Sequence, residues 1–351
     1  MKRAAHTYRP RRTASAGCLT VLALAVLLGA APASGQLVPN LGGQRAGISA
    51  FQFLKIGVGA RGVAMGESYV AVANDASSLY WNPAGMAQMT ENEVFVAHTE
   101  YVADIRHEYL GAVYHLTAVD AVGLSMTSLH MQDMEITTET RPLGTGRYFS
   151  FGDVGIGLSY ARKMTEQFSF GATVRYAEET LDMLKMRSFM VDLGTYYWTG
   201  LGTARFAVVI TNFGADVKPD GTATQTDGGT VTDFQSFSLP TVFKLGFAFE
   251  PVMTDEHRVT TSVQLNHPND NAENVRVGVE YAWQNTFFLR GGLKRTIGQK
   301  LLAADETSEE SFMLGAGFRV ATDVSTISAD YAYAHFNLLG AVHRFSVTFS
   351  L

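Results

Sequence analysis

Apolar and polar residues alternate along most of this chain, in segments separated by turn-forming residues. In the segment 166–179, for example, Phe170 and Val174 fall on one face, and Thr173 and Arg175 fall on the other. A period of two indicates a β-strand with two unlike faces. One face of each segment is rich in Phe, Tyr and Val, and the other carries small or polar residues.

This pattern predicts fourteen strands, an even number. They cover 93–101, 107–116, 119–131, 150–162, 166–179, 187–198, 203–212, 239–249, 256–266, 273–283, 286–297, 311–320, 323–335 and 342–351. Each is long enough to cross a bilayer when tilted, which takes about 9–11 residues. Bacterial outer-membrane barrels have an even number of antiparallel strands.

The connections between the predicted strands alternate between long and short. The two longest are 132–149 and 213–238, whereas connections such as 117–118 are very short. Outer-membrane barrels have short periplasmic turns and longer outer loops, and a soluble β-sandwich has no reason for this alternation. The sequence therefore predicts an all-β fold, a 14-stranded antiparallel transmembrane barrel, with a soluble sandwich as the alternative.

Residues 1–35 have the pattern of a secretory signal peptide. A basic start is followed by the apolar run "CLTVLALAVLLGAA" and by the small residues of "APASG", so we expect cleavage before Gln36. The only cysteine, Cys18, lies in this leader, so we expect no disulfide in the exported chain. The predicted organisation is then an N-terminal segment over 36–92 and a barrel over 93–351.

Composition and motifs argue against several function classes. The full chain has 27 Lys and Arg against 33 Asp and Glu, and the predicted leader removes only basic residues, so nucleic acid is an unsuitable partner. The nine histidines are scattered without zinc-site spacing, and neither a Gly-x-Ser-x-Gly elbow nor a P-loop occurs. We therefore expect no catalytic residues, no metal site and no cofactor.

The stretch "ASSLYWNPAGMAQM", residues 76–89, interrupts the strand pattern before the barrel begins. Small residues dominate the segment before it, and Asp75 is a suitable N-cap for a short helix that Asn82 and Pro83 would end. Irregular backbone at membrane depth is tolerated only where protein or water satisfies it. We therefore expect this stretch to form a plug inside the barrel lumen.

The sequence "GARGVAMGESYVAVANDASSLYWNPAGMA" strongly resembles the N-terminal signature of the PorV/PorQ family, outer-membrane barrels related to the FadL fatty-acid transporters. The stretch 136–164 resembles that family's second outer loop and following strand, and "HRFSVTFSL" resembles its ending, so the likeness covers 48–351. The residues that carry the motif are Asn74, Asp75, Trp81, Asn82, Pro83, Ala84 and Gly85.

The resemblance implies a FadL-like barrel in the bacterial outer membrane, with an N-terminal hatch that contains the Asn-Pro-Ala element. PorV-like members serve the type IX secretion system: they receive exported cargo with a C-terminal β-domain and pass it to a sortase-like surface partner. PorQ-like members instead hold a surface accessory protein. The implied partners also include outer-membrane lipid and, because the last strand resembles a barrel-assembly signal, the barrel assembly machinery.

Two further expectations concern the surface. If the barrel works through its outer loops, Phe234 and Phe237 in the longest loop are candidates for partner contact, with folding back onto the rim as the alternative. A FadL-like transporter of hydrophobic small molecules is the second hypothesis, and it predicts an apolar pocket beside the plug and a gap in the barrel wall. We also expect an aromatic girdle made by Tyr196, Tyr197, Trp198 and Trp283.

Overall fold

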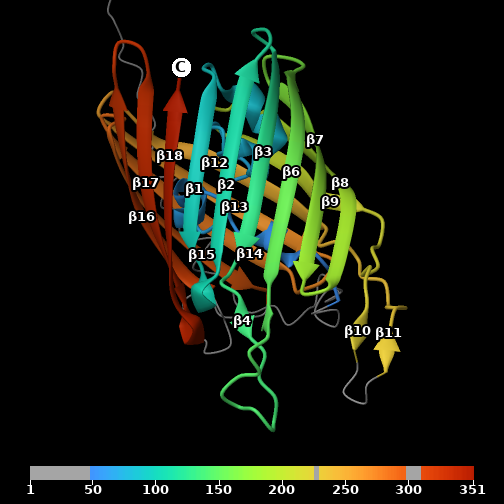
Figure 1. The fold of residues 1–351 in the computed structure, drawn as a ribbon. Coiled ribbons are helices and arrows are strands. Elements are labelled where there is room, and N and C mark those ends of the chain that lie inside the picture. The colour runs from blue at the N-terminus through green and yellow to red at the C-terminus, as the bar shows by residue number, and fades with distance from the viewer. Residues whose placement is uncertain (1–47, 225–228, 298–309) are drawn as a thin grey trace, which may run out of the picture. The chain divides into compact units, whose positions relative to one another are not determined.

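The computed structural model describes residues 48–224, 229–297 and 310–351. The predicted signal peptide lies outside the described residues. Fourteen antiparallel strands form one closed barrel in which β1 pairs with β18, so the sheet has no free edge (Figure 1). This confirms the predicted strand number. Closure satisfies the backbone hydrogen bonds of every strand, as a hydrocarbon environment requires.

The barrel strands match the fourteen predicted segments to within a few residues. Their bounds are β1 Glu93–Glu100, β2 Arg106–His115, β3 Asp120–His130, β6 Phe151–Lys163, β7 Phe168–Leu181, β8 Leu184–Trp198, β9 Arg205–Gly214, β12 Val242–Met253, β13 His257–Pro268, β14 Asn274–Trp283, β15 Phe287–Thr296, β16 Glu310–Ala321, β17 Thr326–Phe336 and β18 Gly340–Ser350.

The other elements are short. Four two-residue strands form two small hairpins: β4 Met134–Glu135 pairs with β5 Tyr148–Phe149, and β10 Ala223–Thr224 pairs with β11 Thr230–Val231. The helical turns are η1 Gln52–Lys55, α2 Ala60–Ala64, α3 Ser78–Trp81, η2 Pro83–Gln88, η3 Val102–Asp104 and η4 Asn337–Leu339. Within the described ranges, no helix is long and apolar enough to cross a membrane.

The two faces of each strand differ in burial as the alternation predicts. On β7, Thr173 and Arg175 are buried inside the barrel, whereas Phe170 and Val174 are exposed on its outer wall. Large apolar side chains are exposed in the same way on most other barrel strands. An outward apolar band around a polar interior is typical of outer-membrane barrels.

The long connections are at one end of the barrel, which we call the loop end; the opposite end, where β18 finishes, is the turn end (Figure 1). At the loop end, long connections follow β3 and β9. The predicted loop between β7 and β8 is wrong, because Leu181 and Leu184 pair across a tight hairpin.

The predicted aromatic girdle is wrong in part. Tyr196 is buried inside the barrel, and Trp198 donates a hydrogen bond from Nε1 to the plug residue Gln88 at 2.8 Å. Trp283, by contrast, is exposed on the outer wall. Consecutive residues of a strand point to opposite faces, so three aromatics in a row cannot all face the lipid.

Residues 49–89 lie inside the barrel as a plug, and nearly all of them are buried or half-buried. Their hydrogen bonds reach strands on well-separated sides of the closed sheet. Ala60 N donates to Ser346 Oγ on β18 at 3.1 Å, Tyr69 N donates to Gln264 Oε1 on β13 at 3.0 Å, and Gln88 Nε2 donates to Ser169 Oγ on β7 at 2.8 Å. A segment held from so many sides fills the lumen.

Candidate functional site

The Trp-Asn-Pro-Ala-Gly stretch forms two short helical turns that meet at Asn82. Asn82 ends α3 and begins η2, and its Oδ1 accepts a hydrogen bond from Ala84 N at 3.1 Å, while Pro83 occupies the first position of η2. Proline is favoured there because its missing N–H would be unpaired anyway. The prediction that Asn82 and Pro83 end the helix agrees with this geometry.

Asn82 also joins the plug to itself and to the barrel. Its Nδ2 donates to the carbonyl oxygens of Val70, in the plug, at 2.9 Å and of Thr195, on β8, at 3.1 Å. A side-chain amide has two N–H donors and an oxygen with two acceptor sites, and leaving any of these unpaired in a buried position costs free energy. Asn82 is fully buried, so this motif residue fixes the plug at the barrel wall.

Glycines on the inner wall allow the plug backbone to approach β7 and β8. A Cβ atom at Gly171 would overlap the backbone of Pro83 and Ala84, and one at Gly194 would overlap the side chain of Asn82. Any larger residue at Gly171 would have to push the plug backbone away. The glycines of β7 and β8 and the Asn-Pro-Ala element of the plug are therefore complementary in shape.

Gly85, the last motif residue, is confined within the plug. A Cβ atom there would lie 2.9 Å from the Ser78 Cβ and would also overlap the Ala73 carbonyl oxygen. Trp81 is buried, and its indole Nε1 donates to Val58 O at 3.0 Å. The Trp81 ring also packs edge-on against Tyr69 and Tyr80, so it lies at the centre of the plug's apolar core.

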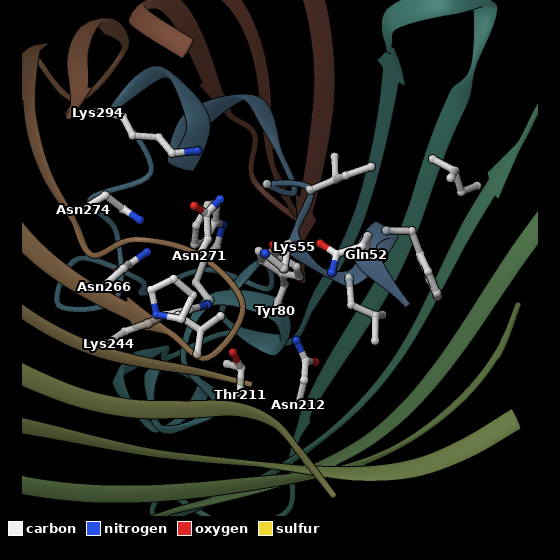
Figure 2. Close-up of a pocket in the computed structure, with 18 of the residues that line it drawn as sticks. Gln52, Lys55, Tyr80, Thr211, Asn212, Lys244, Asn266, Asn271, Asn274 and Lys294 are labelled. Atoms are coloured by element: carbon white, nitrogen blue, oxygen red, sulfur yellow. The ribbon is translucent and has the colours of Figure 1, made fainter. Parts of the chain in front are cut away.

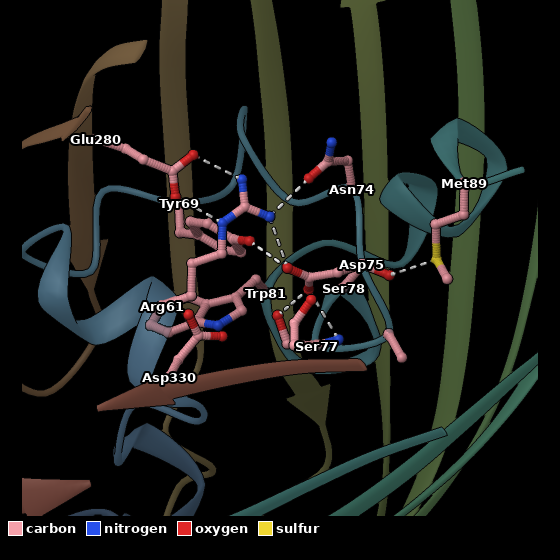
Figure 3. Close-up of polar contacts among 12 residues, drawn as sticks. Arg61, Tyr69, Asn74, Asp75, Ser77, Ser78, Trp81, Met89, Glu280 and Asp330 are labelled. Carbon is pink, nitrogen blue, oxygen red and sulfur yellow. Dashed lines mark hydrogen bonds and ion pairs between the residues drawn. The ribbon is translucent and has the colours of Figure 1, made fainter. Parts of the chain in front are cut away.

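Arg61 of α2 is the centre of a charged network (Figure 3). The network lies on the turn-end side of the plug, beside residues of the β14–β15 turn. Its guanidinium forms a bidentate pair with Glu280 of β14, at 2.9 and 3.0 Å. Glu280 Oε2 also accepts from Arg290 Nε at 2.6 Å, and Arg290 Nη1 donates to Asp330 Oδ1 at 2.6 Å. Plug and barrel are thereby joined by buried, charge-assisted hydrogen bonds.

Asp75 extends this network within the plug. Its Oδ2 accepts from Arg61 Nη1 at 2.8 Å and from the Tyr69 hydroxyl at 2.6 Å, and Asn74 Oδ1 accepts from the same Arg61 nitrogen at 2.9 Å (Figure 3). Burial disfavours the ionised form, but the Arg61 guanidinium and hydrogen bonds from Ser77 and Tyr69 hold the pKa of Asp75 below its ordinary value.

The expectation that Asp75 is the helix N-cap is wrong in detail. Ser77 occupies the N-cap position of α3, and Asp75 accepts a hydrogen bond from Ser77 N at 3.1 Å and another from its hydroxyl. Asp75 thus stabilises the turn before the helix. The side chain can do so because an Asp readily bonds the backbone two residues further on.

Two cavities flank the plug, each of about 460 Å³. The turn-side cavity is lined by the Arg61 network and by residues of the β14–β15 turn, including Gln284 and Asn285. The loop-side cavity is lined by Gln52 and Lys55 of η1, by Tyr80, and by residues of many strands. The plug therefore separates the two ends of the lumen.

Cationic and amide side chains line the loop-side cavity (Figure 2). Arg276 on β14 pairs with the plug carboxylate Glu67, and Lys294 Nζ lies 4.0 Å from the same carboxylate. Lys244 Nζ lies 5.6 Å from the centre of the Tyr80 ring, a cation–π contact. Apolar side chains such as Leu54, Ile56 and Phe151 also line this pocket, so it is a mixed pocket with several charges and not the apolar pocket that a transporter of hydrophobic molecules was expected to have.

The pairing of neighbouring strands is continuous all round the barrel. Register shifts occur only between β8 and β9, β12 and β13, and β16 and β17, among the described strands. At each of these places the pairing resumes within a few residues. The expected gap in the wall is therefore not seen in the described residues.

The two candidate contact residues of the longest loop differ in their surroundings. Phe237 forms an isolated bridge with Val217 and packs against a buried apolar cluster that includes Leu54 and Leu239. This agrees with the alternative that the loop folds back onto the rim. Phe234 is half-buried in the same connection. A role of either residue in partner contact stays a prediction.

The residues that pin the plug from the barrel side were not predicted. Glu280 and Arg290 are charged residues at inward positions of alternating strands, and this was their only sequence signal. Arg61 lies inside the matched motif but was not singled out. Within the described residues, no group of three or more His, Cys, Asp or Glu side chains is placed to hold a metal ion.

Comparison with solved structures supports the fold. The Pseudomonas putida toluene transporter TodX superposes with a TM-score of 0.56 at 12% identity, covering 82% of this chain and 96% of that one. The monoaromatic hydrocarbon channel CymD gives 0.54 at 15% identity, covering 84% and 97%. The Ralstonia pickettii toluene transporter TbuX gives 0.53 at 13% identity, with the same coverage as CymD.

Family comparison is more specific. No curated protein matches the chain. The family model described as type IX secretion system protein PorV matches residues 41–269, which is more than half of the 351 residues and includes the plug and the barrel as far as β13. The chain therefore belongs to the PorV family and folds as a 14-stranded barrel of the FadL type.

Proposed function

We propose that this protein is an outer-membrane component of type IX secretion that acts by binding other proteins at its loop end. It receives exported cargo with a C-terminal β-domain and passes that cargo to a sortase-like surface partner. The observation that carries this proposal is the match of the PorV family model to residues 41–269. The outward apolar band supports placement in the outer membrane, with lipid around it.

The filled lumen supports action at the end of the barrel. The plug bonds to β7, β13 and β18 and separates two cavities of about 460 Å³ each, so the lumen offers no path for a folded domain. Cargo must then be handled outside the lumen. The connection 131–150 and the described parts of 215–241 offer a surface at the loop end for this, and Leu143 in the first of them is 97% exposed.

Binding rather than catalysis is the activity we propose, so no catalytic residue, metal or cofactor is assigned. The barrel assembly machinery would act on the chain only during its insertion. The alternative function is transport of hydrophobic small molecules, as in the toluene transporters that share the fold. The charged loop-side cavity and the continuous wall give that alternative little support in the described residues.

The proposal is tested by purifying a tagged protein from gently solubilised outer membrane and identifying what accompanies it by mass spectrometry. We expect a sortase-like protein or exported proteins that share a C-terminal β-domain. Recovery of the barrel alone with bound lipid or hydrocarbon would contradict secretion and favour the transporter.

A matched pair of variants tests which end of the barrel is used. Phe234→Ser at the loop end should reduce partner recovery several-fold. Leu201→Ser, in the 199–204 connection at the turn end, removes an apolar side chain that is 78% exposed and should have no effect. Equal recovery with both variants would show that Phe234 is not a contact residue while leaving the secretion role intact.

A further inference from the structure

Four cationic side chains share one carboxylate beside the loop-side cavity. Glu67 of the plug is 3% exposed and pairs with Arg276, with Lys294 next to it. Burial disfavours its ionised form, but the attraction of Arg276, Lys294, Arg344 and Lys244 holds the pKa of Glu67 below its ordinary value. These cations come from β14, β15, β18 and β12, so they converge on the plug from different parts of the wall.

Arg344 is buried and only partly satisfied. It is 2% exposed and lines the cavity, and its Nε and Nη1 atoms have no hydrogen-bond partner in the described parts of the chain. His107 is also 2% exposed, and its Nε2 atom is likewise unpartnered there. Thr99 on β1 pairs in register with both residues, so Arg344 and His107 lie on either side of one strand. Buried donors are normally paired, and unpaired ones call for an explanation.

Other carboxylates near the cavity are already engaged. Asp270 binds Lys55 at 2.8 Å, and Asp192 binds Arg175 at 2.7 Å. Glu179 accepts a hydrogen bond from the backbone N–H of Phe51 at 2.7 Å. The described lining of the cavity still holds more cations than carboxylates, because Lys55, Lys244, Arg276, Lys294 and Arg344 stand against Asp153 and Glu179.

Two carboxylates that line the same cavity, those of Asp153 and Glu179, form no ion pair with a cation among the described residues. Asp153 on β6 is opposite Glu179 on β7 in the strand register. Its charge is therefore added beside another carboxylate rather than beside the cations around Glu67. It does not remove the excess at the plug, and a buried charge without a partner is costly.

We propose that the loop-side cavity is a binding site for an oxyanion, a carboxylate or a phosphate group, held by Arg344 and Lys244 above the plug. Arginine presents a donor fork that matches both groups, and lysine supplies a point charge. The amides of Asn212, Asn266 and Asn274 line the same space and can donate to the remaining oxygens (Figure 2). The volume of about 460 Å³ suits a small acid or the end of an extended chain.

The proposal does not depend on the role in secretion. A free small anion and the terminal carboxylate of a polypeptide would present the same chemistry to Arg344. Both would enter from the loop end, because residues next to the loop-end connections, such as Tyr101 and Asn271, line the cavity. The cavity therefore lies next to the surface at which we propose that partners bind.

Isothermal titration calorimetry on the purified full-length barrel in a non-ionic detergent tests the site. The probes are inorganic phosphate and the tripeptide Gly-Ser-Gly in its free-acid and C-terminally amidated forms. We expect saturable binding of at least one oxyanion and none of the amide. Arg344→Gln should weaken binding at least tenfold, and Lys244→Met should weaken it several-fold. Arg258→Gln in the turn-side cavity is the matched control and should not change it.

Each outcome decides the proposal. Binding of the free acid alone identifies a chain end or carboxylate as the ligand, and binding of phosphate alone identifies a phosphate group. Absence of saturable binding by every probe, or equal affinity of the parent and Arg344→Gln, would overturn the site. Arg344→Gln must show the heat-dependent gel migration of a folded barrel. If it does not, the affinity of Lys244→Met decides instead, and an affinity equal to that of the parent would overturn the site.

Discussion

The two sides of the plug hold charges in opposite ways. On the turn side, Arg61 and Arg290 face three carboxylates, those of Glu280, Asp75 and Asp330, and hydrogen bonds connect all five groups. On the loop side, the described lining of the cavity carries five cations and only two carboxylates, those of Asp153 and Glu179. Four of these cations, Arg276, Lys294, Arg344 and Lys244, attract the plug carboxylate Glu67. Both clusters are buried in the same barrel and contact the same plug.

This difference separates anchoring from binding. A buried ion pair with complete hydrogen bonding keeps its partners in one arrangement, and removal of one member is strongly destabilising. An excess of buried cations destabilises the folded protein as long as no anion is bound to them, because a buried charge without a partner is costly. The charges on the turn side therefore anchor the plug to the barrel, and the charges on the loop side are suited to bind a ligand.

The largest expected effect comes from Glu280→Gln, which removes the carboxylate shared by Arg61 and Arg290. Two buried guanidiniums then lose their common partner, so we expect a loss of about 3 kcal/mol in the free energy of unfolding. Guanidinium unfolding in detergent micelles, followed by tryptophan fluorescence, measures it.

Glu166→Gln is the control for this variant. It removes the exposed pair between Lys163 and Glu166, whose carboxylate is 94% exposed, and it should leave the unfolding midpoint unchanged. A loss of stability in Glu280→Gln no larger than that of the control would contradict the anchoring role of the turn side.

Gly171→Ala should have the next largest effect. The added methyl overlaps the backbone of Pro83 and Ala84, which cannot move without displacing the plug, so a loss of about 1–3 kcal/mol is expected. Gly291→Ala is the matched control, since the nearest atom to its Cβ is Leu314 Cδ2 at 3.7 Å. Limited proteolysis would show whether the plug becomes accessible to a protease. Equal cleavage of both variants would show that a methyl group at Gly171 does not displace the plug.

Asn82→Ala removes the cap of η2 and the two hydrogen bonds to Val70 and Thr195. Loss of an N-cap costs about 1 kcal/mol, and the buried carbonyls left unpaired add a similar amount. The same unfolding measurement reports the change. An unchanged midpoint would mean that the plug is held without its Asn-Pro-Ala element.

The smallest effect concerns pH. The pKa of Asp75 is lowered in the folded chain, so its contribution to stability is present above the ordinary Asp pKa of about 3.9 and is lost as the pH falls through the folded value. The unfolding midpoint of the parent should therefore fall more steeply below pH 4 than that of Asp75→Asn. Parallel curves for the two proteins would contradict the role of Asp75.

Much of the barrel could be predicted because each strand is determined by the pattern of its own consecutive residues. Period-two alternation with turn residues located all fourteen strands. The error at the β7–β8 connection arose because Asp182 adopts a φ of 53°, a left-handed conformation that allows a tight hairpin. Asp tolerates that region better than most residues, but the sequence does not say when it does so.

The charged clusters were not predictable for a different reason. Arg61 and Glu280 are 219 positions apart, and Arg344 approaches Glu67 only once the sheet is closed and the plug is inside it. Alternation shows that Glu280 and Arg344 point inward, but their partners follow from the strand register and the position of the plug. The motif itself, by contrast, could be recognised from consecutive residues.

The division between an anchoring side and a binding side of the plug is tested most directly by comparing Glu280→Gln with Arg344→Gln in one unfolding assay without added phosphate or carboxylate. We expect changes of opposite sign in the free energy of unfolding: a loss of about 3 kcal/mol when a paired charge is broken, and a gain on the order of 1 kcal/mol when an uncompensated buried cation is removed. Destabilisation of Arg344→Gln to the same extent as Glu280→Gln would show that Arg344 is a structural residue and contradict the division between the two sides.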